Sequence, residues 1–175
     1  MAIVVGLGFV WQSLQTPPTS RASIVISTPS PSVTATASPA GKCHSVNGLP
    51  DPICTPGLAD PRVTQANIHA TICVSGYTAR VRPPTRYTNA LKAEQIKAYG
   101  YSDTNLADYE EDHLIPLELG GHPTDPRNLW PEPRAGAYAA STKDRLENAL
   151  HKGVCTAVMT LAAAQAAIAD NWELP

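Results

Sequence analysis

The chain has 175 residues, a formal net charge of −2 and 43% apolar residues. This length suits one modest domain with tails, and the near-neutral charge excludes a protein that binds nucleic acid mainly through bulk positive charge. The charges are segregated, because six basic residues lie between Arg62 and Lys97 and six acids lie between Asp103 and Glu118. A basic segment beside an acidic one suits a site that holds a cation and receives a phosphate, although chance segregation on a solvated surface would give the same pattern.

Residues 1–41 predict an apolar segment followed by a stalk. Residues 1–16 carry no charge and are shorter than the ~20 residues of a membrane-spanning helix. They are either the end of an export or anchor segment or a disordered apolar end, and we favour the first. Residues 17–41 are rich in Pro, Ser and Thr and predict a disordered stalk. This layout predicts a secreted or membrane-anchored protein whose domain, residues 42–175, lies outside the cytoplasm.

The four cysteines, Cys43, Cys54, Cys73 and Cys155, contain no CxxC pair and indicate disulfides in an oxidising compartment. The simplest pairing joins Cys43 to Cys54 in a small loop and Cys73 to Cys155 across most of the domain. The longer loop would stabilise the fold by about 4 kcal/mol. A zinc site made from Cys43, His44 and Cys54 is the alternative, but its spacing matches no common zinc pattern.

The segment that begins TICVSGYTARVR predicts a hairpin followed by a helix. Its alternation suggests strands at residues 71–74 and 77–81 with a Ser-Gly turn between them. The next segment, TNALKAEQIKAYG, consists largely of good helix formers. It predicts a helix that is capped by Thr88 or Asn89 and stopped by Gly100.

Two short strands are predicted next. The first covers residues 112–119 and ends at Gly120 and Gly121, and residues 128–130 are the candidate return strand. The connection HPTDPR contains two prolines, which fits a turn and not a helix.

Two helices are predicted after the strands. Ser141 to Asp144 reads S-T-K-D, a capping box that opens a helix ending at Gly153. Thr160 caps the last helix, whose apolar face contains Leu161, Gln165, Ile168 and Trp172. From residue 112 the order is therefore strand, loop, strand, helix, which is a ββα unit.

The ββα unit carries a specific resemblance. An Asp-His pair in an apolar strand, DHLIPLELGG, is followed by NLW and by a capped helix, and this combination resembles the HNH endonucleases of the His-Me finger group. The match covers residues 109–155. The stretch from TICVSGYTARVR to YEEDHLIPLELGG is also similar to small exported bacterial proteins with this core. The resemblance implies an α+β fold: a ββα-metal core with an added N-terminal hairpin and flanking helices, tied by disulfides.

The candidate catalytic residues fit phosphodiester hydrolysis. The reaction needs a base near neutral pKa to activate water and a cation to absorb charge on the phosphate. His113 has the ordinary pKa of such a base. The resemblance implies that Asp112 binds the metal, that His113 faces the water and that Asn128 orients the base by hydrogen bonding. Oxygen coordination predicts Mg²⁺ as the metal, with Mn²⁺ as the alternative.

The helix departs from the HNH pattern. The family usually places a His or Asn on its first turn as the second metal ligand, and residues 135–146 contain neither. Asp144 is the oxygen ligand nearest that place, and capping the helix is its competing role. The basic side chains Arg127, Lys143 and Arg145 are candidates for binding flanking phosphates.

The sequence therefore predicts an exported, metal-dependent HNH-type endonuclease that acts on nucleic acid, with DNA favoured over RNA and no obligate protein partner. The first alternative is a catalytically weak or inactive HNH-like binding module, which the missing helix ligand supports. A second alternative is a small adhesive domain with structural disulfides. Dependence of cleavage on a metal ion distinguishes the first two.

Overall fold

The computed structural model describes residues 43–46, 48–136 and 138–172, so the predicted apolar segment 1–16 and stalk 17–41 lie outside the described residues. The described part is α+β, with a two-stranded sheet, helices and two disulfides. Its strands and α-helices are α1 (Tyr77–Val81), α2 (Thr85–Ala98), β1 (Tyr109–His113), β2 (Leu129–Pro133), α3 (Ala140–Cys155) and α4 (Leu161–Asn171).

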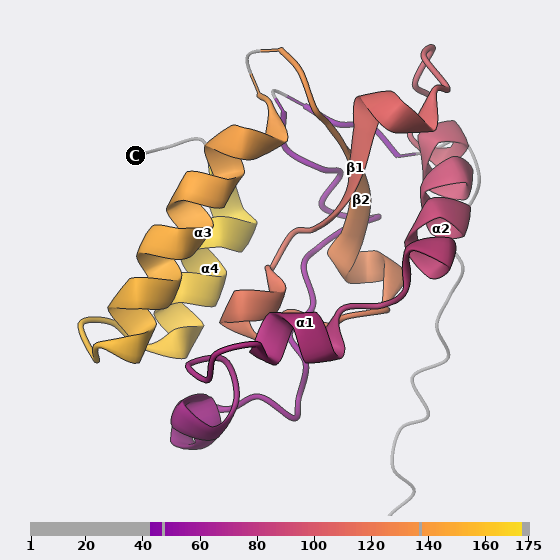
Figure 1. The fold of residues 1–175 in the computed structure, drawn as a ribbon. Helices are drawn as coiled ribbons and strands as arrows, with labels where there is room; N and C mark the ends of the chain where they lie inside the picture. Colours follow the sequence, from indigo (N-terminus) through magenta and orange to yellow (C-terminus); the bar gives the residue numbers. More distant parts are fainter. Residues whose placement is uncertain (1–42, 47, 137, 173–175) are drawn as a thin grey trace, which may run out of the picture. The chain divides into compact units, whose positions relative to one another are not determined.

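The antiparallel β1–β2 hairpin lies between α2 on one side and the α3–α4 pair on the other (Figure 1). Its register pairs Asp112 with Trp130 and His113 with Leu129. Two long side chains dock α2 on the hairpin, because Lys92 Nζ donates to Tyr109 O at 2.9 Å and Gln95 Nε2 donates to the carbonyl of Leu129 at 2.7 Å. From α2, Lys92 therefore holds the first residue of β1, and Gln95 holds β2 at the residue that pairs with His113.

The main core lies where α3 and α4 pack against the segment that follows β1. Leu119, Val154, Ala164 and Ile168 have no exposed surface in it, and Trp172 is also buried there. A second, smaller cluster packs Trp130 against Tyr99 and the Cys43–Cys54 disulfide region. Trp130 on β2 and Trp172 at the end of α4 thus serve as core residues, as their size favours.

The Gly-Gly pair at the end of the motif is required by a close approach of two backbone segments. Gly120 has φ +72°, in the left-handed region that favours glycine. A Cβ on Gly121 would lie 1.7 Å from Ile115 O, and the Gly121 N–H donates to Pro116 O at 3.0 Å. The chain can therefore fold back directly behind the Asp-His strand only if no side chain is present at residue 121.

The predicted hairpin at residues 71–82 is wrong. Residues 77–81 form α1 and the preceding residues form turns. Cys73 N–H donates to Ile68 O and Val74 N–H donates to Thr71 O, so the backbone groups that a strand would use are satisfied locally. Apolar alternation arises here because Ile72 enters the core and Cys73 enters a disulfide, and not because the chain is extended.

Other boundaries also differ from the prediction. The helix α2 begins at Thr85 after Pro84 and not after a Thr88 or Asn89 cap, and α3 continues past Gly153 to Cys155. The first strand ends at His113 instead of residue 119, because Pro116 opens a 3₁₀ turn over Leu117–Leu119. The Ser141–Asp144 capping box is wrong, since α3 begins at Ala140 and no side chain caps its N-terminus. The return strand is longer than predicted and runs to Pro133.

Several predictions are confirmed. The helices α2 and α4 form, and Thr160 Oγ1 accepts from Ala163 N–H as the predicted cap. The disulfides join Cys43 to Cys54 and Cys73 to Cys155. The first bridge leaves no thiolate for the alternative zinc site, and both bridges are typical of an oxidising compartment. Among the described helices, none has the length and apolar character needed to cross a membrane.

Candidate functional site

The candidate site lies at the C-terminal end of β1, facing α3. Along the strand Tyr109, Glu111 and His113 are buried, whereas Glu110 and Asp112 are partly exposed. This alternation sends the side chains of Asp112 and His113 to different neighbours, as strand geometry requires. Asp112 meets α3, and His113 meets the loop that leads to β2.

The imidazole of His113 is held by the backbone carbonyl of Pro123. Its Nε2 lies 3.0 Å from Pro123 O, and a carbonyl can only accept, so Nε2 carries the hydrogen. In the neutral ring Nδ1 is then the basic nitrogen. Burial lowers the pKa of His113 below its ordinary value of 6.5, with only 4% of the residue exposed. The ring is therefore neutral near pH 7, the state that a general base requires.

Arg82 is a neighbour of this base that the sequence analysis did not single out. It follows α1 directly, is exposed, and its positive charge contributes to the lowered pKa of His113. An exposed guanidinium close to a neutral imidazole is suited to bind a phosphate. The signal for it was present in the sequence as the cluster of basic residues between Arg62 and Lys97.

Lys143 is at the centre of the contact between α3 and β1. Its side chain has no exposed surface, and its Nζ lies 2.7 Å from Asp112 Oδ2. The ammonium also donates to His113 O at 2.9 Å and to the Glu147 carboxylate one helical turn away. The ammonium thus has three oxygen neighbours, of which His113 O and the Glu147 carboxylate accept hydrogen bonds and Asp112 Oδ2 forms an ion pair. Burial lowers the pKa of Lys143, but the surrounding carboxyl groups outweigh it and raise that pKa above its ordinary value.

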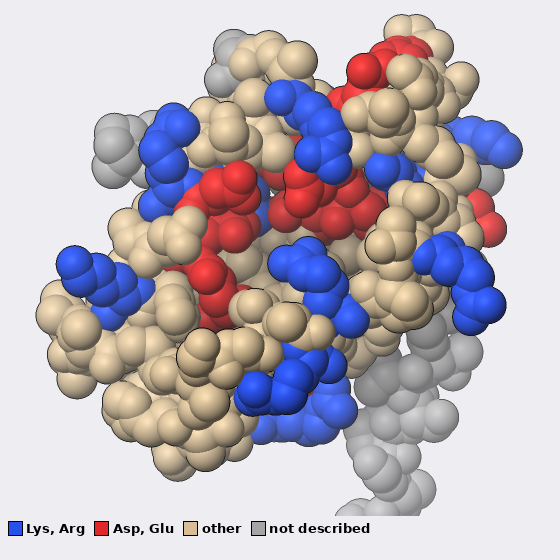
Figure 2. All heavy atoms as spheres, in the orientation of Figure 1, with Lys and Arg blue, Asp and Glu red and all other residues tan. Residues whose placement is uncertain are grey.

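The carboxyl groups around Lys143 are themselves strongly perturbed. Burial raises the pKa of Glu132, on β2, to about 9 and that of Glu147 to about 7. Glu132 therefore holds a proton near neutral pH, and Asp112 supplies the negative charge paired with the ammonium at 2.7 Å. On the face seen in Figure 2, acidic side chains gather in the middle, over the hairpin and α3, and Lys and Arg side chains surround them.

The buried carboxyl group of Glu111 leads to a prediction about how the stability of the fold depends on pH. Its pKa is raised to about 9, first by burial and then by the charge of Asp112. Within the described chain neither of its carboxyl oxygens has a hydrogen-bond partner. The folded state keeps this proton up to about pH 9, whereas the unfolded state loses it near the ordinary value of 4.5. Stability contributed by Glu111 is therefore complete below pH 4.5 and is lost as the pH rises toward 9.

We expect Glu111→Gln to make the free energy of unfolding less dependent on pH between about pH 7 and pH 8.5, by about 1.4 kcal/mol per pH unit. The amide imitates the protonated acid and cannot ionise. Urea unfolding at several pH values measures the slope, with Glu94→Gln at an exposed position of α2 as the control. An unchanged slope in Glu111→Gln would contradict the assignment.

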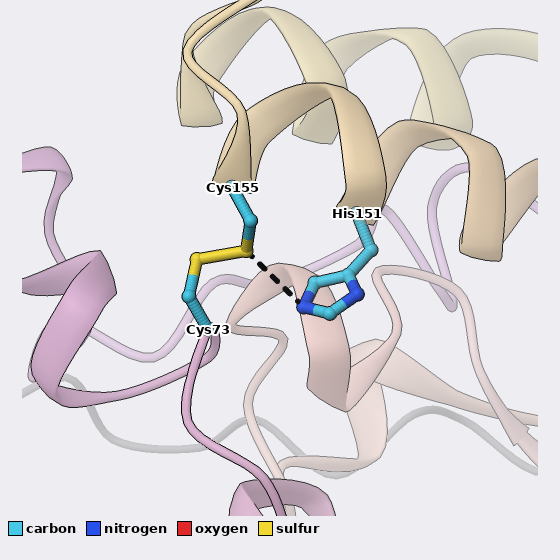
Figure 3. A group of neighbouring side chains, drawn as sticks. All are labelled: Cys73, His151 and Cys155. Atoms are coloured by element: carbon cyan, nitrogen blue, oxygen red, sulfur yellow. Dashed lines mark hydrogen bonds between the residues drawn. A yellow bond between two sulfur atoms is a disulfide. The ribbon is translucent and has the colours of Figure 1, made fainter.

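The predicted metal ligands do not fit a divalent ion in this arrangement. The Asp112 carboxylate already pairs with the Lys143 ammonium, and Asp144 is an exposed residue of α3. Among the described residues, one group of His, Cys or acidic side chains has donor atoms close enough to hold an ion, and it lies elsewhere. That group is Cys73, His151 and Cys155 (Figure 3).

The Cys73–His151–Cys155 group is a disulfide with a histidine beside it. The two sulfurs are bonded to one another, so neither is the thiolate that a metal requires. His151 Nε2 lies 3.0 Å from Ile72 O and 3.4 Å from Cys155 Sγ, and Figure 3 shows the ring edge turned toward the bridge. The group could hold an ion only after reduction, and in this state it connects α3 to the segment around Ile72.

Asn128 is connected to the base through the loop and not by direct contact. Its Oδ1 accepts from the N–H groups of Leu58 and Ile115, and its Nδ2 donates to Ile115 O and His122 O, all at 3.0–3.1 Å. The side chain is fully buried. It therefore fixes the loop up to His122, the residue before the carbonyl of Pro123 that holds the imidazole.

The three predicted phosphate-binding residues are not brought together. Arg127 forms an ion pair with Asp125 at 2.7 Å, and Arg145 donates to Ser141 O on its own helix at 3.0 Å. Both remain at least partly exposed. Lys143 has no exposed surface with which to meet a phosphate, so its predicted role is corrected to the buried ion pair.

Comparison with known proteins gives no relative: no protein family, curated protein or solved structure matches this chain.

Proposed function

We propose that this domain hydrolyses phosphodiester bonds of nucleic acid outside the cytoplasm, as an exported HNH-type endonuclease with His113 as general base. The observation that carries the proposal is the state of His113: a neutral imidazole at the end of β1, oriented through Nε2 by the Pro123 carbonyl. The hairpin β1–β2 and the helix α3 that follows it in the chain provide the ββα frame that the HNH resemblance implies. DNA is the favoured substrate because that resemblance is to DNA-cleaving enzymes.

In the proposed reaction Nδ1 of His113 takes a proton from a water molecule as its oxygen attacks phosphorus. The bond from phosphorus to the leaving sugar oxygen breaks, and that oxygen is protonated from solvent. Exposed basic side chains near the base, with Arg82 as the first candidate, bind the phosphate and offset its negative charge. The Mg²⁺ or Mn²⁺ ion that the resemblance implies would be held by Asp112 and Asp144, which do not fit one here, so no step depends on it.

The test uses the whole chain, produced with both disulfides formed, and supercoiled plasmid DNA as substrate. We expect nicking by the wild-type protein and a loss of about 100-fold or more in His113→Ala. His69→Ala, which changes an exposed histidine, is the control and keeps the activity. A folded wild-type protein that leaves both plasmid DNA and single-stranded RNA intact would overturn the proposal.

The nicking rate should also report the state of the base. Because burial and the neighbouring positive charges hold the pKa of His113 below 6.5, the rate should fall on the acid side only below that value. A rate that already declines as the pH falls from about 8 to 7 would mean that a different group, with a higher pKa, acts as the base.

The second candidate function is a nucleic-acid-binding module without catalysis. It is favoured by one observation: the Asp112 carboxylate, the predicted metal ligand, forms an ion pair with the buried Lys143 ammonium. Retention of labelled DNA by a folded protein that does not cleave it would support this alternative.

A further inference from the structure

We propose that the Lys143 ammonium is the permanent cation of this site, in the position that the HNH resemblance assigns to a divalent ion, so that the domain works without a divalent metal ion. The catalytic part of this inference rests on the proposed phosphodiester hydrolysis. Its structural part, that the site excludes a divalent ion, does not.

The surroundings of the ammonium are those of a small hard cation. Three oxygen atoms surround Nζ, from the Asp112 carboxylate, the Glu147 carboxylate and the backbone carbonyl of His113. Carboxylate and carbonyl oxygens are also the ligands that Mg²⁺ and Mn²⁺ prefer. A divalent ion and this ammonium would therefore compete for the same oxygens.

The burial of Lys143 favours the ammonium over a divalent ion in this competition. Its side chain has no exposed surface, so an ion could enter only if the ammonium moved out from between α3 and β1. That movement would break the hydrogen bond to His113 O and leave buried acids without a counter-charge. Lys143 closes the first turn of α3 and Glu147 lies one turn later, so both partners are held by one rigid helix.

The ammonium has a definite part in the proposed reaction although it does not touch the substrate. Without it, the ionised Asp112 beside the base would repel an approaching phosphodiester. Lys143 neutralises that charge and fixes the backbone carbonyl of His113 to α3, so it is a positioning residue. The charge of the phosphate itself is then left to exposed groups such as Arg82.

The experiment compares wild-type protein with Lys143→Ala and with Lys152→Met, an exposed position of the same helix that serves as the control. Binding of Mn²⁺ is followed by electron paramagnetic resonance, and plasmid nicking is followed with chelator and with added Mn²⁺. We expect the wild type and Lys152→Met to bind no Mn²⁺ at millimolar concentration and to nick equally well in chelator. Lys143→Ala should lose about 100-fold or more of the chelator-resistant rate. It should also bind Mn²⁺ through the released carboxylates.

Two results would overturn the inference: wild-type protein that binds Mn²⁺ and loses it in Asp112→Asn, or wild-type nicking that stops in chelator. Both are measured without the Lys143 variant, so the inference can be refuted even if Lys143→Ala does not fold. Failure of the proposed function gives a different pattern, with no nicking under any condition. In that case Mn²⁺ binding alone decides whether Lys143 excludes the ion.

Discussion

Replacing both Cys73 and Cys155 by Ala is expected to lower the free energy of unfolding by about 4.5 kcal/mol, the value that the chain-entropy relation gives for a loop of this length. The bridge spans 82 residues and connects the segment before α1 to the last residue of α3. Without the bridge the unfolded chain can adopt conformations that the closed loop excludes, so its conformational entropy is higher. A loss of this size is a large part of the stability of a small domain.

The second disulfide provides a matched control for this prediction. Cys43 and Cys54 are separated by 11 residues, for which the same relation gives only about 2.8 kcal/mol. Urea unfolding of the two double-alanine variants, each with the other bridge intact, measures the difference. An equal loss in both variants, or a larger loss from the shorter loop, would show that local packing and not loop closure determines the contribution of each bridge.

Local patterns in the sequence predicted the elements whose cause is local. The helix formers of α2 and the Thr160 cap of α4 carry their signals within a few residues. The hairpin predicted at residues 71–82 failed because its apolar alternation came from tertiary contacts, with Ile72 in the core and Cys73 in a disulfide. A sequence window of that length does not contain the residues that Ile72 and Cys73 contact.

The candidate site shows the same division. Asp112 and His113 were recognised from one short motif, but the role of Lys143 depends on α3 packing against β1, thirty residues away in the chain. A lysine is normally exposed, so its charge was assigned to phosphate binding. One sequence signal does point to the buried pair, since Lys143 and Glu147 are four residues apart and face the same side of a helix. Arg82 was missed because an exposed arginine carries no motif of its own.

Asn128→Ala is expected to lower the free energy of unfolding by about 3–5 kcal/mol, because it leaves four backbone groups without the partners that the amide supplies. Two of them are N–H donors, of Leu58 and Ile115, and two are carbonyls, of Ile115 and His122. Asn148→Ala is the control, since that exposed amide makes one hydrogen bond to its own helix and should change stability by less than about 0.5 kcal/mol.

The size of this effect decides how Asn128 serves the base. If the amide acted on the imidazole directly, Asn128→Ala would keep its stability and lose only nicking activity. The structure instead leads us to expect the loop to loosen, so that the Pro123 carbonyl no longer fixes Nε2 of His113 and stability and activity fall together. Urea unfolding beside the nicking rate separates the two cases. If the free energy of unfolding of Asn128→Ala lies within about 1 kcal/mol of the wild-type value, Asn128 does not hold the loop through these hydrogen bonds. A single unsatisfied buried group already costs that much.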